Sequence, residues 1–126
     1  MSKILIQTSA GELVDKLTIL EIKKEKIKDP KKLGVIEKEY FSLENSFKDK
    51  IKLNSQIQEL RNKLKKINQE LWNIEDDIRL AEKNNNFNEK FIELARSVYK
   101  CNDKRAKIKL EINILTKSDI TEIKQY

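Results

Sequence analysis

Apolar residues recur alternately four and three residues apart through the middle of the chain, from Leu53 to Ala81. The positions are Leu53, Ile57, Leu60, Leu64, Ile67, Leu71, Ile74, Ile78 and Ala81. This heptad spacing is typical of a long helix packed on a partner helix at a shallow angle. The pattern predicts one long central helix that the other segments cover.

A second heptad pattern follows Lys83–Asn86, a run of poor helix formers that favours a turn. Phe87 and Asn88 predict a staple residue and an N-cap for a helix that ends near Thr116. The apolar stripe of this helix is Phe91, Leu94, Val98, Cys101, Arg105, Ile108, Ile112 and Leu115. Two heptad helices joined by a short turn predict an antiparallel helical hairpin.

The first third of the chain predicts two more helices. Ser9 and Glu12 have the spacing of a capping box and open a helix over residues 10–27 that is apolar on more than one face. Such a helix usually lies between others, so we expect it to be central. Pro30 then starts a helix over residues 31–48, with Ile36, Tyr40, Leu43 and Phe47 on one stripe.

The apolar phase slips after Phe47, which predicts a bend or break near residues 49–54. Asn54 or Ser55 would then cap the long helix, with Gln58 completing a second capping box. Apolar and polar residues alternate weakly over residues 3–8, which predicts a short strand. This strand could pair with the tail (118–126) in a two-stranded sheet, or the tail could be loosely ordered. The predicted fold is a single all-α domain over residues 1–126.

Composition agrees with long helices, since the chain has two glycines, one proline, 38% hydrophobic and 38% charged residues. No apolar run is long enough to span a bilayer and no signal-peptide core is visible, so we expect a cytoplasmic protein without membrane partners. The formal charge of +6 comes mostly from lysines mixed with acids. Nucleic-acid binders cluster their charge and add arginines or stacking aromatics, so we do not expect a nucleic-acid partner.

The flanking charges of the long helix bear on self-association. In a parallel dimer Glu70 would face Glu75 of the second copy, and Asp77 would face Glu82. Like charges at these positions oppose parallel pairing. Antiparallel self-association stays open.

Chemistry is restricted to carboxylates, amides and basic groups, because the chain has no histidine, glycine-rich phosphate loop or cysteine cluster. Arg105 occupies a position of its helix where the heptad pattern predicts an apolar side chain, roughly opposite Ile67 and Asn68. Acidic residues of the first helix could pair with it. We expect a structural ion pair, with an anion site or a side chain that reaches water as alternatives.

Two acidic groups are candidates for a Mg²⁺ site: Glu12 with Asp15, and Glu75 and Asp76 with the adjoining Asp77. Against this, Glu12 is already explained as a cap and Glu75 pairs with Arg79 one turn away. Trp72, Tyr99 and Tyr126 could stack on a ligand, although core packing is the simpler role for Trp72 and Tyr99. We expect Cys101, which lies on the apolar stripe, to be a small buried residue.

Four blocks of the chain are similar to a family of small bacterial proteins of unknown function. They are GELVDKLTILEIK (residues 11–23), LWNIEDDIR (71–79), ARSVY (95–99) and NDKRA (102–106). The resemblance implies no activity, but it draws attention to a polar set that could converge where the first helix crosses the hairpin. This set is Glu12, Asp15, Lys16, Glu75, Asp76, Arg79, Arg96, Asn102, Asp103 and Arg105.

The absence of catalytic motifs beside abundant heptad surface favours a non-catalytic helical interaction or assembly module without a cofactor. Its partner would be another protein or a second copy. The alternative is a small Mg²⁺-dependent enzyme or binder of a nucleotide or sugar phosphate. It would use Glu12, Asp15, Glu75 and Asp76 for the metal, and Arg79, Arg96 and Arg105 for the anion.

Overall fold

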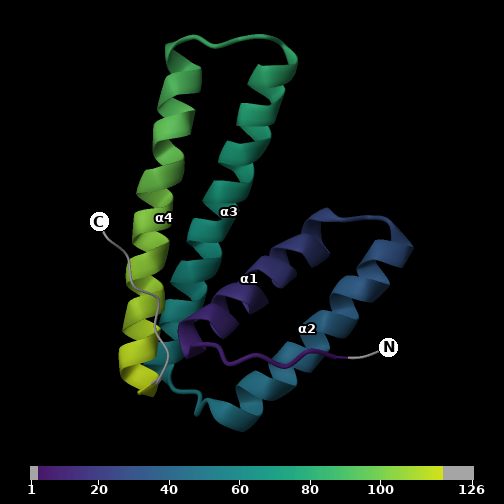
Figure 1. Cartoon of the computed structure of the whole chain (residues 1–126), viewed down its shortest axis with the longest axis vertical. Coiled ribbons are helices and arrows are strands. Elements are labelled where there is room, and N and C mark those ends of the chain that lie inside the picture. The colour runs from purple at the N-terminus through teal and green to yellow at the C-terminus, as the bar shows by residue number, and fades with distance from the viewer. Residues whose placement is uncertain (1–2, 118–126) are drawn as a thin grey trace.

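The computed structural model describes residues 3–117, which form four helices. They are α1 (Ala10–Lys26), α2 (Pro30–Lys50), α3 (Ser55–Lys83) and α4 (Glu89–Thr116) (Figure 1). No strand occurs within this described part of the chain. The predicted all-α class is confirmed.

Each helix begins at a side chain that accepts a hydrogen bond from a backbone N–H of the first turn, which would otherwise have no partner. The pairs are Ser9 with Glu12, Asp29 with Lys31, Asn54 with Ile57, and Asn88 with Phe91. The predicted caps at Ser9, Asn54 and Asn88 are confirmed. Pro30 occupies the first turn of α2, where its missing N–H costs nothing.

The reciprocal halves of the two predicted capping boxes do not form. The carboxylate of Glu12 pairs with Lys109 of α4, and the amide of Gln58 donates to Asn62 one turn along α3. A further correction concerns Leu53, which precedes α3 and is 54% exposed. Ile51, in the same connection, is buried in the core instead.

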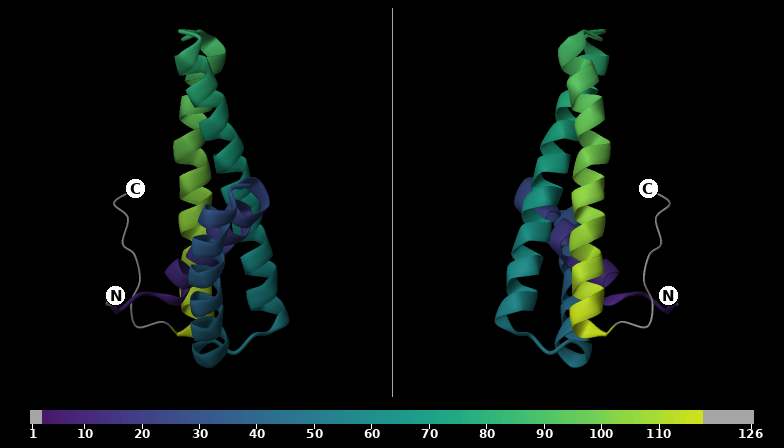
Figure 2. Two further views of the ribbon diagram at one scale, coloured as in Figure 1. Left: turned by 90° about the vertical axis from the view of Figure 1, so that its right-hand side faces the viewer. Right: turned by 90° about the vertical axis from the view of Figure 1, so that its left-hand side faces the viewer.

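Helix α1 is the centre of the molecule, as its apolar faces predict. It packs against α2, α3 and α4, whereas α2 packs mainly against α1 and contacts α3 through the side chain of Arg61. Figure 2 shows α1 and α2 crossing the hairpin of α3 and α4 at its lower part. The first helix of the sequence is therefore the most central helix of the fold.

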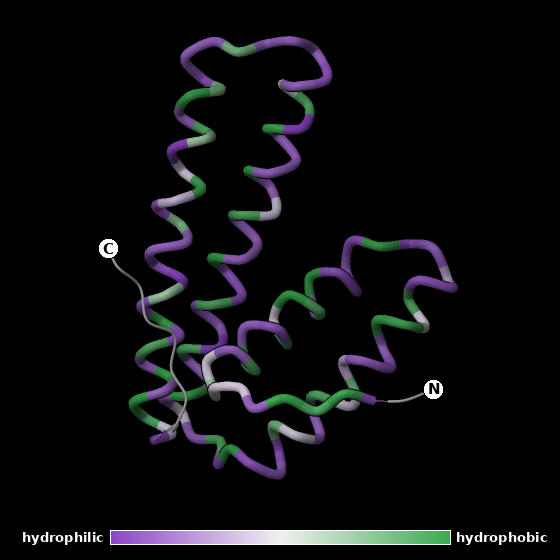
Figure 3. The backbone as a smooth tube through the Cα atoms, viewed as in Figure 1, coloured by the Kyte–Doolittle hydropathy of each residue, from purple (hydrophilic) through white to green (hydrophobic). Residues whose placement is uncertain are grey.

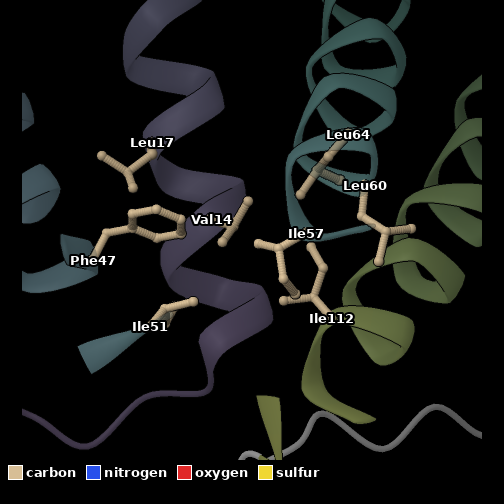
Figure 4. Packing of buried hydrophobic residues seen from close by; sticks show 8 residues of the cluster. All are labelled: Val14, Leu17, Phe47, Ile51, Ile57, Leu60, Leu64 and Ile112. Carbon is tan, nitrogen blue, oxygen red and sulfur yellow. The ribbon is translucent and has the colours of Figure 1, made fainter. Parts of the chain in front are cut away.

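The hydrophobic core lies where α1 crosses the base of the hairpin. Val14 and Leu17 of α1 face Phe47 on one side and Ile57 and Ile112 on the other (Figure 4). These side chains are at most 2% exposed. Each contributes roughly 1.5–3 kcal/mol by its burial, so this junction holds all four helices together.

The other end of the hairpin extends beyond α1 (Figures 1 and 2). We call residues 72–100, which comprise the ends of α3 and α4 and their turn, the projecting hairpin. No residue between 72 and 100 is buried, although apolar residues recur along both helices up to the turn (Figure 3). Beyond α1 the ends of α3 and α4 cover each other only in part, so the apolar stripes that they share stay half-exposed.

The N-terminal segment does not form the predicted strand. Residues 3–9 have no regular secondary structure, and Ile4, Leu5 and Ile6 are 86%, 90% and 79% exposed. The other half of the predicted sheet, residues 118–126, lies outside the described residues.

Candidate functional site: two polar clusters on α1

Helix α1 carries polar side chains among its buried residues. Asp15, Thr18, Glu21 and Glu25 follow one another at three- and four-residue spacing, which places them along one side of the helix. Asp15 and Thr18 are buried, and each of the four side chains forms a hydrogen bond or ion pair with a side chain of α3. The polar contacts divide into two clusters.

The first cluster, the Asp15 network, consists of Asp15, Thr18, Asn68, Asn102 and Arg105. The Asp15 carboxylate accepts from Nε of Arg105 at 2.9 Å and from Nδ2 of Asn68 at 2.9 Å, and its second oxygen pairs with Nη2 of Arg105. Asn68 also donates to the Thr18 hydroxyl at 2.9 Å. One carboxylate thus joins α1, α3 and α4.

The Asp15 network gives Arg105 the ion pair that its position on an apolar stripe predicts. A buried guanidinium without a partner would cost several kcal/mol. The Arg105 side chain is 27% exposed and that of Asp15 only 4%, so the carboxylate is the more deeply buried partner. The bidentate geometry fixes the register of α4 relative to α1.

Two neighbouring contacts hold the start of α1 against the end of α4. Glu12 pairs with Lys109, and the Gly11 N–H donates to Oδ1 of Asn113 at 2.7 Å. A Cβ on Gly11 would lie 2.5 Å from the backbone carbonyl oxygen of Lys109, closer than atoms can approach. Gly11 is therefore required by the close contact of the two helices.

The second cluster, the Arg61 cluster, consists of Arg61 and its partners Glu21, Tyr40, Glu44 and, beside it, Lys65. Nη2 of Arg61 donates to Glu21 at 2.7 Å, to Glu44 at 2.9 Å and to the Tyr40 hydroxyl at 3.2 Å. The guanidinium also lies over the Phe47 ring, 5.0 Å from its centroid. This arginine links α1, α2 and α3.

The Arg61 cluster shifts the pKa values of its members. Burial opposes the charge on Arg61, but hydrogen bonds to Glu44 and Glu21 outweigh it and raise the Arg61 pKa above its ordinary value. Burial, aided by the charges of Glu21 and Glu44, raises the pKa of Tyr40 to about 12. A hydrogen bond to Glu25 raises the pKa of Lys65. All of these groups therefore keep their protons at neutral pH.

A cavity of about 600 Å³ opens beside the Arg61 cluster, between α1, the end of α2 and the start of α3. Its walls are polar and charged over an apolar patch. They include Glu21, Glu44, Phe47, Lys48, Ile51, Lys52, Leu53, Gln58, Arg61, Asn62 and Lys65. Arg61 and Lys65, whose pKa values are raised, are among its lining residues.

The structure brings only part of the predicted polar set together. Glu12 and Asp15 pair with Lys109 and Arg105, while Glu75 and Asp76 pair with exposed Arg79 on the projecting hairpin. Within residues 3–117 no group of three or more His, Cys, Asp or Glu side chains is placed to hold a metal ion. The predicted metal residues thus occupy two separate places, each with basic partners.

The remaining predicted residues lie apart. Arg96 is exposed on α4, away from Arg105. Tyr99 is 53% exposed, which corrects its core assignment, and Trp72 is half-buried. Cys101 is buried as predicted, and burial and the nearby Glu70 raise the pKa of its thiol. Tyr126 lies outside the described residues.

The Arg61 cluster was not predicted, although the sequence contains one signal for it. Arg61 is one of four arginines in a chain with 27 basic residues, so lysine is the default cation here. Arginine is preferred over lysine where one cation must bind two carboxylates at once, because its planar guanidinium presents several N–H donors in a fixed arrangement. Three of the four arginines, Arg61, Arg79 and Arg105, do pair with acids in the structure.

The fold and these clusters define an all-helical protein whose central helix is joined to its neighbours by partly buried ion pairs. The described residues include no helix long and apolar enough to cross a membrane. A family profile matches residues 4–126, and the chain belongs to DUF6165, a family of unknown function. No curated protein and no solved structure was found to match the chain.

Proposed function

We propose that the protein is a non-catalytic helical interaction module, and that the projecting hairpin is its contact element. The observation that supports this most is the exposure of the hairpin. Leu80, Ile92 and Tyr99 are 57%, 53% and 53% exposed, beside stripe residues that are only half-buried. Apolar residues at heptad spacing are normally covered by another helix.

We further propose that a second copy of the chain covers the projecting hairpin in antiparallel orientation. Between residues 70 and 83, α3 carries five acidic and two basic residues, so parallel pairing would bring like charges together. Antiparallel pairing would instead bring this acidic stretch toward the end of α1 in the other copy. That end carries Lys23, Lys24 and Lys26.

The size of the hairpin fits a modest interface. The part of each helix beyond α1 is about 20 Å long at 1.5 Å per residue, and two helices are about 20 Å wide. A surface of this size is at the lower end of specific interfaces. We therefore expect a dimer that dissociates on dilution.

The Mg²⁺-dependent alternative has less support, because the predicted carboxylates lie in two places and each has a basic partner. The Asp15 network also satisfies its own hydrogen bonds: no buried side-chain nitrogen or oxygen within residues 3–117 lacks a partner. A complete internal network stabilises the fold and leaves few groups for a metal.

Sedimentation velocity over a range of protein concentrations tests the proposal. We expect the unmodified protein to dimerise, and the double variant Leu80→Glu with Ile92→Glu to stay monomeric. Val35→Glu is the matched control, since Val35 is 70% exposed on α2, outside the hairpin; it should dimerise normally. A monomer at all concentrations, or a double variant that still dimerises, would overturn the proposal.

A further inference from the structure

The cavity beside the Arg61 cluster has the features of a small-anion site, independently of the hairpin. Its lining includes three apolar residues, Phe47, Ile51 and Leu53. Its volume of about 600 Å³ lies within the range of small-molecule sites. The question is which ligand its charges would select.

The position of Arg61 in the cavity wall is fixed from behind. Glu21 and Glu44 bind Nη2, and Glu44 also accepts from Nη1 at 3.4 Å. Among residues 3–117, no group accepts a hydrogen bond from Nε of Arg61, yet no buried side-chain nitrogen there lacks a partner. Nε is therefore not fully buried, and the Arg61 side chain, which is 10% exposed, lines the cavity.

Two lysines add positive charge to the same cavity. Lys48, in the last turn of α2, and Lys52, in the connection to α3, are exposed and line the cavity. Neither has an ion-pair partner among the described residues, whereas Lys65 in the same wall is held by Glu25 at 2.8 Å. Four basic groups face two acids in the cavity lining.

We propose that this cavity binds a small phosphate monoester. The phosphate would lie against Lys48 and Lys52, with the Arg61 guanidinium in the same wall, and the organic group would lie against Leu53, which is 54% exposed. A compact dianion matches a wall that carries two lysines and a guanidinium better than a single carboxylate does. The carboxylates of Glu21 and Glu44 hold the guanidinium and select against ligands that lack N–H or O–H donors on the organic part.

Titrations followed by amide proton–nitrogen correlation spectra at low ionic strength test this proposal. The probes are AMP, ribose 5-phosphate, inorganic phosphate and adenosine. We expect saturable shifts with AMP or ribose 5-phosphate, confined to residues of the cavity wall, weaker binding of inorganic phosphate and none of adenosine. No saturable shift with either ester, or adenosine bound as tightly as AMP, would overturn it.

Variants test which residues hold the phosphate. The double variant Lys48→Gln with Lys52→Gln should weaken ester binding at least about tenfold, the effect of losing one charge-assisted hydrogen bond. The control is Lys31→Gln with Lys32→Gln, two exposed lysines of α2 outside the cavity, and should bind as the unmodified protein does. Equal affinity of the two double variants would refute the assignment. All four lysines are exposed, so neither pair of changes disturbs the core.

Discussion

Replacing Asp15 with asparagine tests whether the Asp15 network holds α1 to the hairpin. The change keeps the size of the side chain but removes its charge. The Asp15 carboxylate accepts two hydrogen bonds from Arg105 and one from Asn68. In the variant, an amide N–H₂ group would stand where one oxygen now faces the guanidinium, so donor would meet donor.

The expected cost follows from burial. A hydrogen bond to a charged group contributes about 1.5–3 kcal/mol to stability. The Asp15 side chain is 4% exposed, so its contacts keep most of that value, while Arg105 is 27% exposed and can recover some hydration. We expect Asp15→Asn to reduce the free energy of unfolding by about 2–3 kcal/mol. For a chain of this length the midpoint of thermal unfolding would fall by roughly 6–15 °C.

Denaturant unfolding of four proteins measures the effect: unmodified, Asp15→Asn, Arg105→Met and the double variant. The two changes should be strongly coupled, with the double variant losing much less than the sum of the single losses. Asp76→Asn is the control, because its carboxylate is exposed and 3.6 Å from exposed Arg79; it should change stability by less than about 0.5 kcal/mol. A loss at Asp15 as small as the control's, or additive losses, would refute the reasoning.

Three further predictions concern single residues. Gly11→Ala should lower the free energy of unfolding by about 1–3 kcal/mol, because the new methyl group meets the α4 backbone. Gly34→Ala, with nothing within 4 Å of the new methyl group, should raise it by roughly 0.5–1 kcal/mol. Chemical denaturation compares the two variants, and equal effects would refute the steric argument. Because the folded-state pKa of Tyr40 is raised from 10.0 to about 12, the stability given by its protonated phenol is complete below about pH 10 and is lost as the pH rises toward 12. Phenolate absorbance should show a component near pH 12 that is absent in Tyr40→Phe and kept in Tyr99→Phe; a component unaffected by Tyr40→Phe would contradict the assignment. The Cys101 thiol, buried and with a raised pKa, should react with iodoacetamide far more slowly in the native protein than in denaturant, and similar rates would show that the site is open.

The sequence predicted the helices well because their signals are local. The residues beside Asn54 and Asn88 indicate N-caps, and each side chain accepts the expected hydrogen bond. The heptad periods indicated the long helices to within two residues. Leu53 shows the limit, because periodicity alone cannot tell whether the first apolar residue of a stripe lies inside the helix or in the connection before it.

The polar clusters were predicted less completely, because they depend on how distant helices meet. The position of Arg105 on an apolar stripe indicated an ion pair, and acids of the first helix were among the expected partners. Nothing in the spacing along α1 and α2 indicated that Glu21 and Glu44 would meet at Arg61. Glu21 and Glu44 are 40 and 17 positions from Arg61 in the sequence, and only the packing of α1 against both α2 and α3 brings them together.

The central claim, that the projecting hairpin pairs with a second copy in antiparallel orientation, is tested most directly by a distance between hairpin turns. A spin label at Asn86→Cys, in a chain with Cys101→Ala, places one label at the turn of each copy. Since each projecting segment is about 20 Å long, antiparallel pairing predicts an intermolecular dipolar distance of roughly 20–35 Å, including the label arms. The absence of any intermolecular dipolar coupling at high protein concentration, or a distance below about 15 Å as parallel pairing would give, would contradict the claim.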